Sequence, residues 1–170
     1  MSTARNMSGG RVGRASLEKG RQGRALCRWC NLEVPAGRFT FCSDWCVHEW
    51  RLRTDSGYLR QCVLERDKGV CALCGVDAEV AYLDLKRARG THKQKLLELW
   101  GLKRVHSFEQ GGHKGFALRA RKSLWDADHI LPVAEGGGEC DLANLRTLCL
   151  ICHRKETRGL RKRLADARAS

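Results

Sequence analysis

Hydrophobic positions are unevenly spread along the chain, and their spacing predicts where regular structure begins. Residues 1–24 show no hydrophobic period and contain five glycines, so we expect a flexible basic tail. Within residues 58–67, by contrast, Leu59, Cys62 and Val63 recur on one helical face. This spacing predicts an amphipathic helix, with Cys62 as a thiol of its packed face.

The middle of the chain, residues 76–122, is interpreted as an insertion between two more strongly patterned parts. Its leucines at positions 96, 97 and 102, with the tryptophan at 100, predict one helix. Glycines at positions 111, 112 and 115 predict a loop. Beyond its positive charge, the insertion carries no pattern to which we assign a function.

The C-terminal part predicts a strand, a loop, a short strand and a helix, in that order. Residues 124–131 (LWDADHIL) form the predicted strand, which Pro132 ends. Residues 135–138 (EGGG) predict a turn-rich loop. After the short strand, residues 150–165 predict a helix rich in arginine and lysine.

The spacing of the cysteines predicts two tetrahedral metal sites. One set of four thiolates joins two C-x-x-C pairs that lie far apart in sequence: Cys71, Cys74, Cys149 and Cys152. The other set lies near the N-terminus: Cys27, Cys30, Cys42 and Cys46. Four thiolates leave zinc no open position, so both sites are expected to be structural. Ser43 or Asp44 is expected to cap a short helix that places Cys46 one turn beyond Cys42.

Two other chemistries use the same cysteine spacing. Each C-x-x-C pair would be a redox pair in a thioredoxin-like protein, but no βαβ pattern surrounds either pair. Cys149-x-x-Cys152-His153 also matches the motif for covalent haem attachment. A cytochrome of that type often needs a methionine as its second axial ligand, and the only methionines are Met1 and Met7. Structural zinc is therefore the preferred interpretation.

Charge and composition point to an intracellular protein that contacts nucleic acid. Lysine and arginine total 32 against 19 acidic residues, a formal net charge of +13. Two zinc sites with four thiolates each would lower it to roughly +9. Such a charge favours DNA as the partner, through phosphate contacts. Neither a signal peptide nor an apolar run of about 20 residues is present. We therefore expect reduced cysteines, no membrane contact, and a cytoplasmic location in a bacterium or phage or a nuclear one in a eukaryote.

Taken together, the C-terminal motifs resemble a known family. Asp128-His129-Ile130, a glycine loop, Asn144-Leu145 and the cysteine motif ending in His153 are similar to the zinc-containing HNH endonucleases of the His-Me finger superfamily. The segment from Cys27 to residue 60, with its FCSDWCVHEW motif, extends the resemblance to the C-terminal nuclease module of zinc-finger DNA annealing helicases. The sequence contains no phosphate-binding G-x-x-x-x-G-K-[ST] loop, so no nucleotide cofactor is expected.

The resemblance implies a ββα-metal site in which Asp128 and His153 hold a divalent ion, for which Mg²⁺ or Mn²⁺ is expected. His129 suits the general base, because an imidazole titrates near neutral pH. Asn144 is expected to orient His129 or to pin the loop through its amide, and a plain turn asparagine is the alternative. Because neighbouring residues of a strand point to opposite faces, Asp128 and His129 can share a site only where the strand twists or ends.

The basic helix supplies candidate phosphate contacts at Arg154, Lys155 and Arg158, with a solvated basic face as the alternative. The expected fold is a small, zinc-stabilised α+β protein. A flexible tail (1–24) and a small zinc-knuckle module with four cysteine ligands (25–56) precede an HNH nuclease domain (57–170). A zinc-finger DNA-binding protein without catalysis, or an inactive descendant of the nuclease, is the main alternative. An RNA-binding zinc knuckle is a weaker one.

Overall fold

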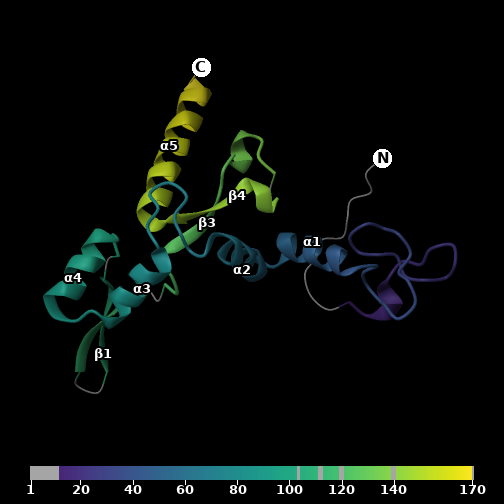
Figure 1. The fold of residues 1–170 in the computed structure, drawn as a ribbon, viewed down its shortest axis with the longest axis horizontal. Helices are drawn as coiled ribbons and strands as arrows, with labels where there is room; N and C mark the ends of the chain where they lie inside the picture. The colour runs from purple at the N-terminus through teal and green to yellow at the C-terminus, as the bar shows by residue number, and fades with distance from the viewer. Residues whose placement is uncertain (1–11, 103, 111–112, 119–120, 139–140, 170) are drawn as a thin grey trace. The chain divides into compact units, whose positions relative to one another are not determined.

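The computed structural model describes residues 12–102, 104–110, 113–118, 121–138 and 141–169 (Figure 1). The described residues form two compact units. The first contains the described residues up to Cys62 together with residues 141–142, and the second contains the remaining described residues. The boundary lies inside helix α2 (Ser56–Asp67), whereas the sequence suggested residue 56.

The first unit is built around one cysteine quartet. Its core contains Cys27, Trp29, Val34 and Cys46, and its main helix is α1 (Asp44–Thr54). As predicted, a residue at position 43 or 44 caps this helix: the Ser43 hydroxyl accepts a hydrogen bond from the Cys46 N–H at 3.2 Å. The cap fixes the helix start, so that Cys46 reaches the quartet.

The ordered part of this unit begins before residue 25, where the sequence predicted a flexible tail to end. A short 3₁₀ helix spans Arg14–Ser16, and Lys19 forms a backbone bridge with Ala25. The Arg24 guanidinium donates to the Val34 carbonyl at 2.6 Å. A short turn, one backbone bridge and a side-chain hydrogen bond leave no hydrophobic period, so the pattern alone did not indicate them. Residues 1–11 lie outside the described residues.

In the second unit, the insertion is more regular than expected. It contains two helices, α3 (Ala78–Arg87) and α4 (Gly90–Leu99), instead of one. Strands β1 (Arg104–Gln110) and β2 (His113–Leu118) pair as an antiparallel hairpin. Gly115 lies opposite Phe108 in this hairpin, so the loop predicted around the glycines is wrong at Gly115. Positions 111 and 112 lie outside the described residues.

The C-terminal part has the predicted order of elements. Strand β3 (Trp125–His129) pairs antiparallel with β4 (Leu145–Cys149), and α5 (Leu150–Ala169) follows without a break. Two 3₁₀ turns, Val133–Glu135 and Leu142–Asn144, interrupt the connecting loop. Figure 1 shows both strands beside the first turns of α5. The chain is thus a small α+β protein, as expected, with a strand–strand–helix core.

Side chains from both strands and from the insertion bury this core. Leu124, Trp125, Leu148 and Thr147 are almost fully buried. The Trp125 indole N–H donates to the Glu79 carboxylate of α3 at 2.5 Å, which satisfies the polar end of a buried aromatic ring. Among the described residues, no helix has the length and apolar character needed to cross a bilayer.

An ion pair at the C-terminal end of α2 holds that end against β4 through hydrogen bonds. Asp67 accepts the Thr147 N–H at 2.9 Å and pairs with Arg66, which donates to the Leu145 carbonyl at 2.6 Å. The hydrogen bond from Arg66, with those from Thr147, lowers the pKa of Asp67 against the opposing effect of burial. The ionised carboxylate therefore stabilises the strand that leads into the site.

Replacing Asp67 with asparagine is expected to lower the free energy of unfolding by about 1 to 3 kcal/mol at neutral pH, because a charge-assisted pair is lost. A carboxylate with a lowered folded pKa stabilises above its unfolded pKa, about 3.9, and loses this contribution as pH falls through the folded pKa. The difference between the two proteins should therefore shrink below about pH 4. Urea unfolding of both proteins, at neutral pH and below about pH 4, measures this difference in the free energy of unfolding. A difference that does not vary with pH would assign the effect to packing.

Candidate functional site

Two carboxylates and an imidazole meet where β3 faces the start of α5. Asp126 and Asp128 are two residues apart on the strand and so share a face. Asp128 Oδ1 lies 3.5 Å from His153 Nε2, and Asp126 Oδ2 lies 3.3 Å from His153 Nδ1. The structure thus brings together the two residues expected to hold an ion, Asp128 and His153.

His129, the predicted base, is the last residue of β3 and lines a pocket of about 340 Å³. Asp128 lines the same pocket, together with residues of the following loop and of α5. Alternation along a strand would put the two neighbours on opposite faces, but the strand ends at His129 and the chain turns at Pro132. The strand end therefore lets both side chains reach one site.

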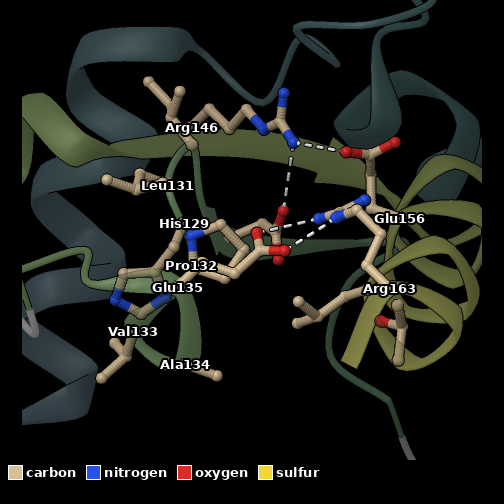
Figure 2. A pocket seen from close by; sticks show the side chains of 13 residues that line it. His129, Leu131, Pro132, Val133, Ala134, Glu135, Arg146, Glu156 and Arg163 are labelled. Carbon is tan, nitrogen blue, oxygen red and sulfur yellow. Dashed lines mark hydrogen bonds and ion pairs between the residues drawn. The ribbon is translucent and has the colours of Figure 1, made fainter. Parts of the chain in front are cut away.

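Ion pairs made by two arginines border this pocket (Figure 2). Arg146, which lies opposite Asp128 in the β3–β4 register, places Nη2 2.9 Å from Glu156 and 3.5 Å from Asp128. Arg163 of α5 holds Glu135 of the loop at 2.7 Å. Within the part of the chain that the structure describes, Arg146 Nε is buried without a hydrogen-bond partner. The pocket therefore holds positive charge beside the Asp128 carboxylate.

Asn144 pins the loop that follows β3. Its amide oxygen accepts the Leu131 N–H at 2.8 Å, and its amide nitrogen donates to the carbonyls of Leu131 at 2.9 Å and Gly138 at 3.4 Å. A Cβ on Gly137 would lie 1.9 Å from the Leu131 carbonyl oxygen, so only glycine fits there. Of the roles considered for Asn144, these contacts support loop pinning.

If the site cleaves DNA, as the family resemblance implies, replacing Asn144 with alanine should release residues 130–138 and slow that cleavage about 100-fold, because small displacements of reacting groups carry large rate costs. Zinc content should not change. Hydrogen exchange of the Leu131 amide, read beside the cleavage rate, measures both effects. If cleavage slowed while the Leu131 amide stayed protected, Asn144 would act at the reaction itself and not through the loop.

Both predicted cysteine quartets are assembled. In each, the four sulfur atoms lie within 4.8 Å of one another. The closest sulfur pairs, Cys42 with Cys46 at 3.3 Å and Cys74 with Cys149 at 3.7 Å, are far beyond the disulfide bond length of about 2.05 Å. The nine described cysteines are free thiols, and Cys62 is half-buried on α2. Each quartet fits a zinc ion.

The acidity of these thiols supports the same conclusion. Burial and neighbouring sulfurs raise the pKa of Cys30 to about 12, and the same causes raise the pKa of Cys152. Burial also acts on Cys71, but hydrogen bonds from backbone groups outweigh it and lower its pKa to about 6. Four sulfurs packed together thus resist full ionisation by themselves, and a divalent cation removes that penalty.

The three candidate phosphate contacts differ in their surroundings. The Arg154 guanidinium donates hydrogen bonds to backbone carbonyls. Its Nε donates to the Leu150 carbonyl at 2.9 Å, and its terminal nitrogens donate to the Trp100 and Gly101 carbonyls at the end of α4. This arginine therefore joins α4 to α5 by capping orphan carbonyls. Lys155 and Arg158 are exposed, and Arg158 lines a groove shared with His153 and Arg161.

The sequence did not single out Arg146, Glu156 or the Glu135–Arg163 pair. Each belongs to a pattern of charged residues that is common on solvated strands and helices, so its spacing carries no signal. For Asp126 the sequence does contain a signal, because Asp126 stands two residues before Asp128 and therefore lies on the same face of the strand.

Comparison with known proteins identifies the class of protein. Residues 113–159 match the family model described as HNH endonuclease. The chain is 33% identical over 162 residues to the DNA annealing helicase and endonuclease ZRANB3 of Mus musculus, covering 87% of this chain and 14% of that relative. Against ZRANB3 of Homo sapiens it is 35% identical over 133 residues, covering 75% and 12%. The chain belongs to the HNH endonuclease family, as the resemblance of its motifs implied.

The crystal structure of the human ZRANB3 HNH domain is 30% identical, with 69% of this chain and 98% of that chain covered and a TM-score of 0.48. The chain spans only 12 to 14% of the length of the curated relatives.

Proposed function

We propose that this chain is a metal-dependent endonuclease that hydrolyses phosphodiester bonds in DNA. His129 acts as the general base, and Asp128 and His153 hold a divalent ion, Mg²⁺ or Mn²⁺. The two cysteine quartets hold structural zinc. The observation that carries the proposal is the convergence of Asp128 on His153 at 3.5 Å, beside a pocket that His129 also lines.

The donor set suits such an ion. One carboxylate oxygen and one imidazole nitrogen leave several coordination positions for water and for a phosphate oxygen. When bound, the ion supplies charge stabilisation to the phosphate in the transition state. Four thiolates in each quartet, by contrast, leave no open position, so the zinc ions support the fold.

The remaining steps belong to side chains of the chain. His129 accepts a proton from the attacking water at its imidazole nitrogen, and Asn144 keeps the neighbouring loop in place. Arg146 lies in the same pocket, so its guanidinium can neutralise charge that develops on the phosphate. Arg146 would then exchange its contacts with Asp128 and Glu156 for phosphate oxygens.

DNA is held on the basic side of α5. Lys155, Arg158 and Arg161 are exposed on this helix, and His153 shares a groove with Arg158 and Arg161. Arg154 contributes by holding this helix against α4 and not by a free guanidinium. An intracellular location, nuclear in a eukaryote, goes with the proposal because the thiol quartets need a reducing environment.

Nicking of supercoiled plasmid tests the proposal. The zinc-loaded chain is expected to nick DNA with added Mg²⁺ or Mn²⁺ and to stop when those ions are withheld. The substrates should include duplex, flap and branched DNA, since the motifs do not specify a structure. A protein that shifts all these substrates in a gel and cuts none with either ion is a DNA-binding module without catalysis, and the proposal would be wrong.

A further inference from the structure

The contact between Asp126 and His153 is separate from the contact between Asp128 and His153. Asp126 lies at Nδ1 of the His153 ring and Asp128 lies at Nε2. The two nitrogens of an imidazole point in different directions, so the two carboxylates contact different sides of the ring. In a neutral imidazole, one nitrogen carries the proton and the other offers a lone pair.

Asp126 is itself held in place from the end of the insertion. Arg121 places one guanidinium nitrogen 2.7 Å from Oδ1 and 2.6 Å from Oδ2 of Asp126. The Arg121 backbone carbonyl accepts the hydroxyl of Tyr82 on α3 at 3.2 Å. A chain of contacts therefore runs from α3 through Arg121 and Asp126 to His153. The insertion, to which the sequence assigned no function, supplies its outer end.

We propose that Asp126, clamped by Arg121, is a positioning residue: it accepts the Nδ1–H of His153, so that the Nε2 lone pair faces the ion held with Asp128. The inference rests on the proposed metal site. A carboxylate behind a metal-binding imidazole fixes its tautomer and its ring orientation, and loss of such a partner typically weakens metal binding about 10- to 100-fold. Arg121 keeps the carboxylate oriented toward the ring.

The tautomer of His153 can be measured without an ion and without cleavage. The zinc-loaded chain, labelled with ¹⁵N and free of added Mn²⁺, is studied by NMR at about pH 8, where a histidine is ordinarily neutral. His153→Gln identifies the ring signals. We expect a protonated Nδ1 and an unprotonated Nε2. A ring protonated at Nε2 would overturn the inference.

Variants test the two positions in the chain of contacts. Asp126→Ala should shift the ring toward the Nε2–H tautomer and weaken Mn²⁺ binding about 10- to 100-fold by EPR titration. Asp126→Asn, which keeps an acceptor oxygen, should leave most of the His153 rings in the Nδ1–H tautomer. Arg121→Ala should act in the same direction with a smaller effect. Asp84→Ala and Lys122→Ala, both at exposed positions, are the matched controls and should behave as wild type.

Other outcomes would contradict the inference. If Asp126→Ala abolished Mn²⁺ binding but left the tautomer unchanged, Asp126 would be a direct ligand. If neither the tautomer nor Mn²⁺ binding changed in Asp126→Ala and Arg121→Ala, the contacts would have no positioning role. Absence of plasmid nicking together with the expected tautomer and Mn²⁺ affinities would reject the proposed nuclease activity and leave the role of Asp126 intact.

Discussion

Replacing His129 with alanine is expected to lower the rate of DNA cleavage by about 100- to 10,000-fold, the usual contribution of a general base. The side chain lies at the end of β3 and lines the pocket, where it is partly exposed. It belongs to neither cysteine quartet and is absent from the buried core. Zinc content, helix content and DNA affinity should therefore stay close to wild type. The measurement is plasmid nicking in single-turnover conditions.

His92→Ala is the matched control, because His92 is an exposed histidine on α4. It should cleave at the wild-type rate. Unchanged cleavage by His129→Ala would remove this residue from the mechanism. Loss of zinc or helix content in step with activity would show that its role is structural.

Replacing Cys152 with serine is expected to release one of two zinc ions and to unfold α5. Cys152 is buried in the first turn of that helix and completes the quartet with Cys149, Cys71 and Cys74. Structural zinc contributes an apparent binding free energy of about 10 to 16 kcal/mol in small domains, so much of the stability of this unit depends on it. Since His153 follows directly, Mn²⁺ binding and cleavage should be lost as well.

Cys62→Ser is the control for this prediction. Cys62 is a free, half-buried thiol outside both quartets. Its substitution should leave both zinc ions and the far-ultraviolet circular dichroism of α5 unchanged. Elemental analysis of each purified protein counts the zinc. If Cys152→Ser retained two zinc ions per chain, the assignment of the quartet would be wrong.

The predictions that came closest to the structure depend on local chemistry. The cysteine quartets were found because closely spaced cysteine pairs, three C-x-x-C and one C-x-x-x-C, have few other uses in a reduced chain, and the structure gathers both sets. The strand, loop, strand and helix of the C-terminal part follow from Pro132, the glycines and the basic helical segment, which act within a few residues. The Ser43 cap is of the same kind.

The sequence was least informative where pairing or packing between elements decides the outcome. Gly115 favours a loop by itself, but pairing with Phe108 makes it part of a strand. Arg154 stays a predicted phosphate contact, but the carbonyls at the end of α4 hold its guanidinium in this structure, which its place in a basic helix did not indicate. Neither contact can be inferred from residue spacing, because one depends on strand pairing within the insertion and the other joins the insertion to α5.

The sequence by itself determined the metal-binding thiols, the family, and the residues proposed as base and ion ligands, since these depend on residue type and short-range order. Only the tertiary structure decided the orientation of these side chains. Strand β3 ends at His129, so that His129 and Asp128 line one pocket, and Asn144 ties the loop beside it. Arg121 brings Asp126 behind His153 from the far end of the insertion. Orientation depends on contacts between segments that are distant in the chain, and those contacts form only when the core packs.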